Sequence, residues 1–374
     1  MKKYLFAAGG TGGHINPALA AASALKELDP GCEIVFVGAR GKMEEKLVPQ
    51  AGFELRLINA AGFYRALTPK AMLHNAKAVM LLAKSTAQVS SILRSFTPDA
   101  AAGFGGYVSG SVLRMAQARG IPTVIHEQNA FPGVTNKALA KRANAVLLTT
   151  QEAEKHMQSR VPCKVTGLPV RKELLEANRL ESRFMLELDD RPLVLSMGGS
   201  LGAKPINDAM IEVIAAKAKS ADCYFMHAAG TEEAAAEFAS ELEKRGVNLA
   251  AAKHIIIRPY ITDMARCLSA ADLVISRAGA SSLAELQALG KPSVLIPSPY
   301  VSENHQYHNA MALCNNGAAR LVEEKELTGE RLLKEISSLL ANKSALNQMG
   351  DCAKKMALLD AAKEIAMAIY SSCR

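Results

Sequence analysis

Residues 9–14, which read GGTGGH, decide how the first part of the chain folds. The apolar run 4–8 precedes them and a helical pattern over residues 18–28 follows, so the sequence predicts a strand, a glycine turn and a helix. A turn this rich in glycine lets backbone N–H groups close on an anion at the positive end of a helix dipole. His14 falls in the first helical turn, where that dipole is expected to lower the imidazole pKa. We therefore predict a phosphate site and a base in one stretch.

The composition is typical of a globular protein with more than one domain. A chain of 374 residues is longer than one hydrophobic core usually supports, so two domains are expected. Hydrophobic residues make up 49% of the chain and charged residues 21%. Seven scattered cysteines without a CxxC pair favour a reducing compartment over disulfides or a zinc site. No run reaches the roughly 18 uninterrupted apolar residues of a membrane span, and Lys2 and Lys3 precede a strand-length run rather than a signal-peptide core.

The net charge of +8 is unevenly distributed along the chain. Residues 1–171 hold 21 Lys/Arg against 10 Asp/Glu, whereas the remainder holds 23 against 26. A basic first half predicts an anionic partner, and a membrane surface and nucleic acid both fit that charge. Nucleic acid is the weaker alternative, because aromatic residues make up 5% of the chain and are not interleaved with the basic ones.

Strand and helix patterns alternate in both halves, which predicts an α/β fold with doubly wound parallel sheets. In the first half, strands are expected at 33–38, 53–58, 98–104, 122–126 and 145–149, with helices at 43–50, 109–119 and 135–143. The pattern restarts after Gly167-Leu168-Pro169 with a strand at 191–196, the glycine turn MGGSLGA at 197–203 and a helix from Ile206. Further strands are expected at 223–228, 254–258, 273–276 and 293–297.

This restart predicts two Rossmann-like domains, with boundaries at 1–168 and 169–355. A polar connecting helix is expected over 173–188. The last residues, 356–374, carry a helical pattern at 356–370 and are expected to return to the first domain.

The first glycine turn fits nicotinamide or ATP chemistry poorly. Ile15 stands where a dinucleotide fingerprint has its third glycine, and Ala39 and Arg40 follow Gly38 in place of a ribose-binding acid. No Lys-Ser/Thr pair closes the turn, which excludes a P-loop. A purely structural turn between strand and helix stays open as an alternative.

A second polar edge is predicted in the first half. The turn GFGGYVSG at 103–110 follows a strand and opens a helix at Ser109. His126, Glu127, Gln128 and Asn129 end the next strand, and carboxyl ends of parallel strands converge on one edge. A His126 satisfied by backbone groups is the alternative, and no HExxH pattern supports a metal.

Two stretches of the second half suggest ligand contacts. In SRAGASSLAE (276–285), the amides of residues 280–282 can bind phosphate, and Glu285 can hold ribose hydroxyls or act as a capping-box carboxylate. In SENHQYHN (302–309), His305 and Gln306 are unusually polar, and solvated surface is their alternative.

Five motifs in order carry a resemblance to a known family. GGTGGHxxP, GFGGYVSG, HEQN followed by PGVTNK, GGSLGA and SRAGASSLAE resemble the MurG family of bacterial N-acetylglucosaminyltransferases from residue 5 to about residue 322. The resemblance implies a GT-B fold, with two Rossmann-like domains facing an interdomain cleft. It implies inverting, metal-independent transfer of N-acetylglucosamine, without a cofactor, from UDP-GlcNAc to the C4 hydroxyl of MurNAc in undecaprenyl-diphosphate-MurNAc-pentapeptide (lipid I). The products are lipid II, for peptidoglycan synthesis, and UDP.

The same motifs imply site residues. Donor contacts fall on Thr11, Gly12, Gly13, Asn129, Arg171, Ser200, Ile261, Arg277, Ala280, Ser281, Ser282, Leu283, Ala284, Glu285 and Gln306. Acceptor contacts fall on Gly105, Gly106, Tyr107, His126 and Asn136. An inverting transfer needs one base, for which His14 is the first choice and Glu127 the second. Leu168, Leu201 and His305 depart from the family pattern, and we expect them to alter donor affinity modestly.

Other functions of the same fold remain alternatives at this point. They are a UDP-sugar enzyme with another acceptor, a UDP-GlcNAc epimerase, and a non-catalytic binding protein. The HEQN and GGYVSG turns argue against another acceptor or an epimerase reaction. The presence of His14, Glu127 and Glu285 argues against a non-catalytic binding protein.

Residues 69–96 suggest where the chain meets its lipid substrate. Apolar residues such as Met72, Leu73 and Met80 lie among the cations Arg65, Lys70, Lys77 and Lys84. That pattern predicts peripheral docking on the anionic cytoplasmic face of the cell membrane. An apolar stripe that packs in the core is the alternative.

Overall fold

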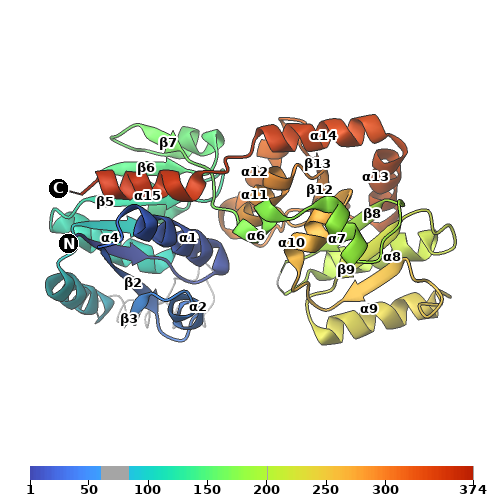
Figure 1. Cartoon of the computed structure of the whole chain (residues 1–374), viewed down its shortest axis with the longest axis horizontal. Coiled ribbons are helices and arrows are strands. Elements are labelled where there is room, and N and C mark those ends of the chain that lie inside the picture. Colours follow the sequence, from blue (N-terminus) through green and yellow to red (C-terminus); the bar gives the residue numbers. More distant parts are fainter. Residues whose placement is uncertain (60–83, 200, 374) are drawn as a thin grey trace. The chain divides into compact units, whose positions relative to one another are not determined.

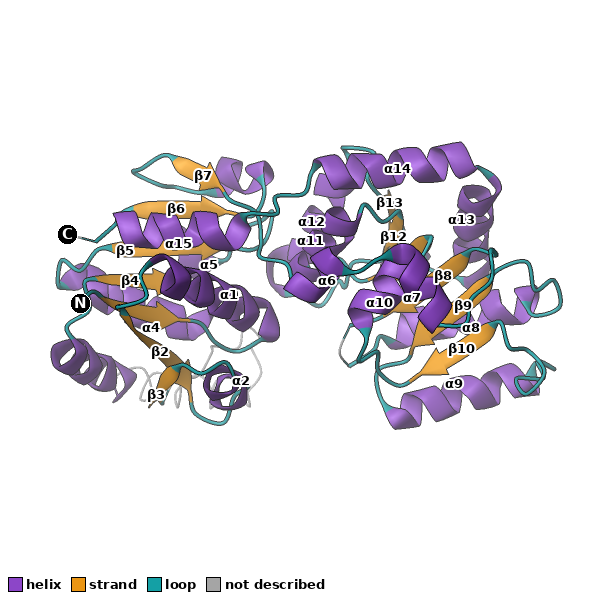
Figure 2. Ribbon diagram, viewed as in Figure 1, coloured by secondary structure: helices purple, strands orange, loops and turns teal. Residues whose placement is uncertain are grey.

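The computed structural model describes residues 1–59, 84–199 and 201–373. Two compact units make up the chain: Met1–Pro169 together with Leu358–Arg374 form the first, and Val170–Ala357 form the second. Each unit is built on one parallel β-sheet with helices on both faces (Figures 1 and 2).

The sheet of the first unit has seven parallel strands in the order β3-β2-β1-β4-β5-β6-β7. The strands are β1 (Lys3–Ala7), β2 (Glu33–Ala39), β3 (Glu54–Ile58), β4 (Ala100–Gly103), β5 (Thr123–Glu127), β6 (Ala145–Leu148) and β7 (Cys163–Val165). The helices are α1 (Gly12–Leu28), α2 (Glu44–Gln50), α4 (Gly106–Ala118), α5 (Val134–Ala140), α15 (Ala361–Ser371) and the 3-10 turn η1 (Gln151–His156). Residues 84–96 are also helical.

Strand β1 shows why both faces of this sheet are covered. Tyr4 and Phe6 pack into the cluster that holds α1 and α15, whereas Leu5 and Ala7 pack into the cluster that holds α4 and α5. Successive side chains of a strand point to opposite faces, so a strand that is apolar at every position needs helices on both sides.

The sheet of the second unit has six parallel strands in the order β10-β9-β8-β11-β12-β13. The strands are β8 (Leu193–Met197), β9 (Tyr224–Ala228), β10 (Ile255–Arg258), β11 (Leu273–Ser276), β12 (Ser293–Leu295) and β13 (Arg320–Leu321). The helices are α6 (Lys172–Glu176), α7 (Arg179–Met185), α8 (Lys204–Lys217), α9 (Glu232–Lys244), α10 (Met264–Ala270), α11 (Ala280–Leu289), α12 (His305–Cys314), α13 (Gly329–Ala341), α14 (Lys343–Lys355) and the 3-10 turns η2 (Ser302–Asn304) and η3 (Glu324–Glu326).

The expected α/β class, with two doubly wound parallel sheets, is therefore confirmed. Several helix ends differ from expectation. The connecting helix expected over 173–188 is two helices, because Asn178 accepts from Glu181 N at 3.1 Å and caps α7. The helix expected over 356–370 begins only at Ala361 and continues to Ser371 as α15, and α4 begins at Gly106 rather than at Ser109.

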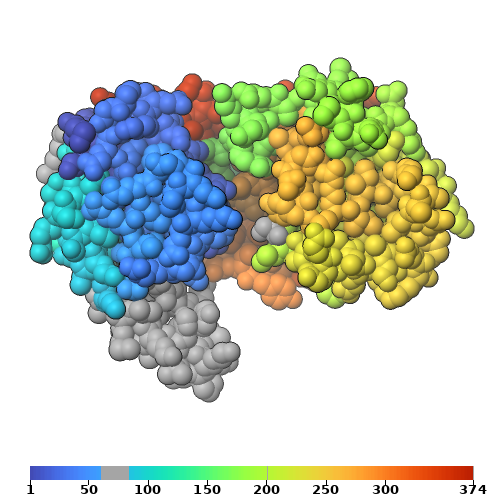
Figure 3. Space-filling model, turned by 60° about the horizontal axis from the view of Figure 1, so that its bottom comes forward, coloured from blue at the N-terminus to red at the C-terminus, as the bar shows by residue number. Residues whose placement is uncertain are grey.

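The C-terminal helix α15 packs against α1 in the first unit (Figure 1). Lys164 pairs with Glu364 at 2.5 Å, and Lys2 Nζ lies 3.8 Å from the Tyr370 ring centroid. In the surface view, red C-terminal residues lie beside blue N-terminal ones (Figure 3). Gly167 has a φ of +80°, and a Cβ there would lie 2.6 Å from Leu358 Cβ, so only glycine fits where the chain passes its returning segment.

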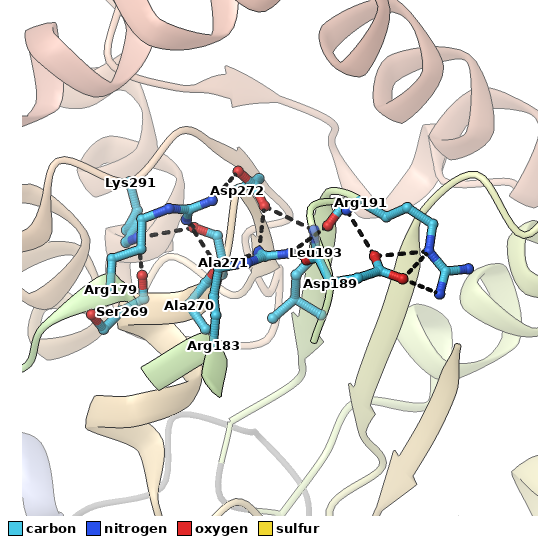
Figure 4. A network of polar contacts seen from close by, with 10 residues as sticks. All are labelled: Arg179, Arg183, Asp189, Arg191, Leu193, Ser269, Ala270, Ala271, Asp272 and Lys291. Carbon is cyan, nitrogen blue, oxygen red and sulfur yellow. Dashed lines mark hydrogen bonds and ion pairs between the residues drawn. The ribbon is translucent and has the colours of Figure 1, made fainter. Parts of the chain in front are cut away.

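Two arginines of helix α7, Arg179 and Arg183, bind this helix to the rest of the second unit (Figure 4). Arg179 and Arg183 donate to the carbonyl of Ala270 and pair with Asp272, which also accepts from Leu193 N at 2.9 Å. Lys291 donates to the carbonyls of residues 269 and 271. These cations satisfy carbonyls at the end of α10, where the helix dipole favours positive charge.

The proposed membrane segment lies largely outside the described residues, which exclude Arg65, Lys70, Met72, Leu73, Lys77 and Met80. In its described part, Val89, Leu93 and Phe96 are buried in the first unit's core and Lys84 is exposed. The apolar stripe over 84–96 is thus core. No helix within the described residues is long and apolar enough to cross a membrane.

Candidate active site

The first glycine turn places His14 at the beginning of α1. Thr11 is the N-cap, and its carbonyl accepts from His14 N at 3.1 Å and from Ile15 N at 3.2 Å. The side chain of Thr11 holds the imidazole as well, with Oγ1 3.3 Å from His14 Nδ1. Gly12 and Gly13 precede the first intrahelical hydrogen bond, so their N–H groups have no acceptor within the helix. The turn is therefore built to offer amides to an anion beside an imidazole.

The second glycine turn lies directly against the first. A Cβ on Gly106 would lie 2.6 Å from the Gly9 carbonyl oxygen, and a Cβ on Gly105 would lie 3.0 Å from His14 Nε2. Both glycines have positive φ, +92° at Gly105 and +78° at Gly106. Tyr107, next along α4, lies beside Gly10. The structure thus brings two residues expected at the acceptor site, Gly105 and Gly106, against the expected base, and Tyr107 against the same glycine turn.

Glu44 supports this pair of turns, although sequence reasoning missed it. It is fully buried, and its Oε1 accepts from Gly10 N at 3.3 Å and from Ala39 N at 3.1 Å. A Cβ on Gly9 would lie 2.6 Å from that same oxygen. Burial and the Glu44 carboxylate raise the pKa of Tyr107. The only signal in the sequence was an acidic residue at the start of α2, which commonly serves the helix dipole alone.

Glu127 is a buried carboxylate whose two oxygens both accept hydrogen bonds. Oε1 accepts from Asn129 N at 2.9 Å and Asn129 Nδ2 at 3.2 Å, and Oε2 accepts from Gly133 N at 3.1 Å and Asn136 Nδ2 at 2.9 Å. Burial raises the pKa of Glu127, and these donors oppose that rise. Three expected site residues therefore form one cluster around the loop that follows β5.

His126 is held as a neutral imidazole in the core. Its Nε2 donates to the Gly167 carbonyl at 2.9 Å, and its Nδ1 accepts from Gln128 Nε2 at 3.2 Å. Burial lowers the pKa of His126 to about 4. This is the backbone-satisfied histidine that the sequence left open as the alternative to an acceptor contact.

In the second unit, Arg171 and Glu285 form an ion pair. Arg171 Nε lies 3.0 Å from Glu285 Oε1 and its Nη2 lies 2.9 Å from the same oxygen. Glu285 is largely buried, and burial raises its pKa against the lowering effect of Arg171. Two expected donor residues that are far apart in sequence are thus neighbours. Arg171, rather than the helix start, is the partner of this carboxylate.

Helix α11 presents its amino end without a side-chain cap. Gly279 is the N-cap, and the first intrahelical bond runs from Leu283 N to the Gly279 carbonyl at 3.0 Å. The N–H groups of residues 280–282 precede that bond, so Ala280, Ser281 and Ser282 offer amides at the positive end of the dipole. The side chains of Leu283 and Ala284 are buried.

Of the remaining expected donor residues in the second unit, Ile261 and Arg277 lie in loops and Gln306 lies in the first turn of α12. Arg277 pairs with Glu324 and donates to the Ile296 carbonyl, so it is already engaged. Ile261 is buried, and Gln306 Oε1 accepts from Ser298 N at 2.9 Å.

Three further positions bear on the donor site. His305 Nδ1 donates to the Ser302 carbonyl at 2.8 Å, and Leu201 is exposed. Ser200 lies outside the described residues.

A buried histidine lies beneath the glycine turn of the second unit and was not expected from sequence. Ser196 Oγ donates to His227 Nδ1 at 2.8 Å, and His227 Nε2 donates to Asn207 Oδ1 at 3.1 Å. Burial lowers the pKa of His227 to about 3. Asn207 also donates to the Ala229 carbonyl, which joins the start of α8 to the loop after β9.

Metal ligands do not gather in the part of the chain that the structure describes: no group of three or more His, Cys, Asp or Glu side chains is placed to hold an ion.

GT-B glycosyltransferases are built from two doubly wound parallel-sheet domains, and comparisons with known proteins place this chain in that class. The glycosyltransferase family 28 N-terminal domain matches residues 4–148, and the family 28 C-terminal domain matches residues 193–365. A crystal structure of Acinetobacter baumannii MurG superposes with a TM-score of 0.79 at 29% identity, covering 99% of this chain and all of that one. A Staphylococcus aureus MnaA–UDP structure, at 13% identity and a TM-score of 0.67, shares the fold.

Relatives of similar sequence identify the family within this class. The UDP-N-acetylglucosamine--N-acetylmuramyl-(pentapeptide) pyrophosphoryl-undecaprenol N-acetylglucosamine transferase of Desulforamulus reducens is 42% identical over 96% of this chain and 95% of its own. The enzyme of that name from Acetivibrio thermocellus is 42% identical over 97% and 96%. The chain belongs to this transferase family, within glycosyltransferase family 28.

Proposed function

We propose that this chain transfers N-acetylglucosamine from UDP-GlcNAc to the C4 hydroxyl of MurNAc in lipid I, giving lipid II and UDP for peptidoglycan synthesis. The observation that carries the proposal is the near full-length identity of 42% to relatives that bear the name of this transferase. The finer chemistry is our inference: the reaction inverts the anomeric centre, forms a β-1,4 linkage and uses no metal.

The donor belongs to the second unit in this proposal. The amides of Ala280, Ser281 and Ser282 hold phosphate oxygens at the start of α11, and Glu285 accepts from the ribose hydroxyls. The backbone at Ile261 contacts the uracil, and Gln306, whose Oε1 already accepts from Ser298 N, offers its N–H groups to the sugar. Arg171 orients Glu285 through their ion pair. Arg277 supports the leaving UDP only after exchanging its present partners.

The acceptor belongs to the first unit. The turn at Gly105 and Gly106 offers amides to its diphosphate, and Tyr107 lies beside Gly10. The amides of Thr11, Gly12 and Gly13 stay assigned to the donor, as the resemblance implies. His14 takes the proton of the C4 hydroxyl as that oxygen bonds to the sugar C1 and the C1–O bond to UDP breaks, with UDP leaving as the anion. Glu127 is the second candidate. Four donors already occupy its two oxygens, so Glu127 is better suited to joining the loop after β5, at Asn129 and Gly133, to Asn136 of α5.

One assay separates this function from its alternatives. Labelled UDP-GlcNAc is supplied with lipid I, and lipid II and UDP are measured with and without EDTA. Equal lipid II formation in both arms is expected. UDP release without lipid product would indicate another acceptor, conversion of the sugar would indicate an epimerase, and tight UDP binding without turnover would indicate a binding protein.

We also propose peripheral attachment to the anionic cytoplasmic face of the membrane through residues 69–96. The support is the cluster of cations in that stretch, of which Lys84 is exposed. Charge reversal of Lys77 and Lys84 together is expected to reduce sedimentation with phosphatidylglycerol vesicles, whereas Lys253→Glu, at an exposed lysine of the second unit, should not. Unchanged sedimentation of the double variant would refute this docking surface.

A further inference from the structure

Helix α7 exposes its apolar side chains and buries polar ones, which is the reverse of an ordinary surface helix. Leu180 is 79% exposed and Phe184 is 80% exposed, whereas Ser182 and Arg183 are buried. Leu180 and Phe184 are four residues apart, so they lie on the same face of the helix. Met185 is exposed beside Phe184. We call Leu180, Phe184 and Met185 the α7 patch.

The buried face of α7 holds the helix in this orientation. Arg183 donates to the carbonyls of Asp189, Arg191 and Ala270 and pairs with Asp272 at 3.2 Å, all within the second unit (Figure 4). A rotation that buried Leu180 and Phe184 would take the guanidinium away from these acceptors, and buried carbonyls are costly to leave without donors. The outward direction of the α7 patch is therefore fixed by the structure of the second unit.

A cluster of large apolar side chains on a surface marks a place where another molecule binds, whereas single exposed apolar residues are ordinary. The outward face of α7 consists of Leu180, Glu181, Phe184 and Met185, so three of its four side chains are apolar. Leucine and phenylalanine gain most from leaving water, so their burial would drive association.

The charges around the α7 patch decide which kind of partner fits. Residues 172–190 expose six acidic side chains: Glu173, Glu176, Glu181, Glu187, Asp189 and Asp190. The exposed cations of this stretch, Lys172 and Arg179, are paired with Glu176 and Asp272. An anionic bilayer is repelled by such a surface. A symmetric contact between two copies would bring the same carboxylates together, which is also unfavourable.

We propose that the α7 patch binds a cationic amphipathic helix of a partner protein. The apolar side chains of that helix pack on Leu180, Phe184 and Met185, and its lysines or arginines face Glu181 and the neighbouring carboxylates. The patch shares no residue with the donor or acceptor contacts. The inference therefore stands or falls independently of the proposed transferase reaction.

A designed peptide of this chemistry tests the surface. The probe is a fluorescein-labelled helical peptide of about 18 residues with leucines on one face and lysines on the other. Fluorescence anisotropy should show that it binds at least about 10-fold more tightly than a peptide with glutamate at each lysine position. Leu180→Ser combined with Phe184→Ser should weaken the lysine peptide at least about 10-fold. Binding should slow hydrogen exchange in residues 172–190.

Leu28→Ser is the matched control, because Leu28 is an exposed leucine at the end of α1 in the first unit. It should leave the affinity within about 2-fold of the parent. Glu181→Lys reverses one charge beside the patch and keeps its apolar residues, so it should weaken the lysine peptide about 2- to 5-fold. This second variant tests the surface even where the serine variant does not fold.

Failure of the lysine peptide to bind, equal affinity for the serine variant and the parent, or exchange protection outside residues 172–190 would overturn the inference. Two further measurements compare the serine variant with the parent. Loss of self-association in sedimentation velocity would assign the α7 patch to a second copy of the chain. Loss of sedimentation with phosphatidylglycerol vesicles would assign it to the membrane. Either loss also overturns the inference, and unchanged behaviour in both measurements supports a protein partner.

Discussion

At the scale of single residues, His14 is the group on which the proposed chemistry depends. Thr11 Oγ1 lies 3.3 Å from its Nδ1, and Gly105 lets the backbone of the second turn lie against its ring. We expect His14→Ala to lower kcat by about 10²- to 10⁴-fold, because loss of a general base leaves the hydroxyl proton in place. UDP affinity, measured by calorimetry, should stay within about 2-fold. Unchanged turnover with weakened UDP binding would assign His14 to the donor instead.

Glu44 takes no part in the proposed reaction, but its carboxylate holds the backbone of the first glycine turn. Glu44→Ala leaves the N–H groups of Gly10 and Ala39 without their acceptor, so we expect a loss of about 1–3 kcal/mol in the free energy of unfolding. Hydrogen exchange should accelerate in the peptide spanning 9–14 more than in β1. Glu45→Ala, which removes the neighbouring carboxylate that accepts from Gly41 N, serves as the control. Uniform acceleration across the unit would mean a purely global effect.

At the scale of elements, the sequence predicted where the helices lie, but not the residues at which several of them begin and end. The apolar spacing within α1 and α8 is local, so it was readable. The break between α6 and α7 depends on one Asn178 cap, and the early start of α4 depends on two glycines with positive φ that meet the first turn. Such ends are set by single hydrogen bonds and close contacts, which hydrophobic periodicity does not record.

The ion pair between α11 and the residue before α6 leads to a prediction about the donor. If Glu285 holds the ribose, Glu285→Gln should weaken UDP binding by about 5- to 30-fold and abolish the preference for UDP over 2′-deoxy-UDP in calorimetry. Glu176→Gln, which breaks the exposed pair with Lys172, should leave both quantities unchanged. A Glu285 variant that still prefers UDP would place the ribose elsewhere.

At the scale of the whole molecule, two buried histidines make both units sensitive to acid. Burial lowers the pKa of His126 to about 4 and that of His227 to about 3, whereas an unfolded histidine titrates near 6.5. Below about pH 6.5 the unfolded chain therefore binds protons that the folded chain does not. The free energy of unfolding should fall as pH drops toward 4, by up to about 1.4 kcal/mol per pH unit for each histidine.

Urea unfolding at pH 7.5, 6.0 and 5.0 measures this dependence, with each unit followed by hydrogen exchange. His227→Gln should flatten the dependence in the second unit only, because His126 lies in the first. Equal stability at pH 7.5 and 5.0 would show that these imidazoles take up protons in the folded state.

The sequence alone determined the two parallel-sheet domains, because strand runs, glycine turns and helical spacing are local patterns that repeat in both halves. It also singled out His14 and Glu285 as chemical groups. Only the tertiary structure decided their partners: Thr11 and Gly105 beside His14, Arg171 on Glu285, and the glycine slot that holds Glu44. It also placed His126 in the core, where its Nε2 donates to the Gly167 carbonyl. Those contacts join residues far apart in the chain, so folding, rather than local spacing, creates them.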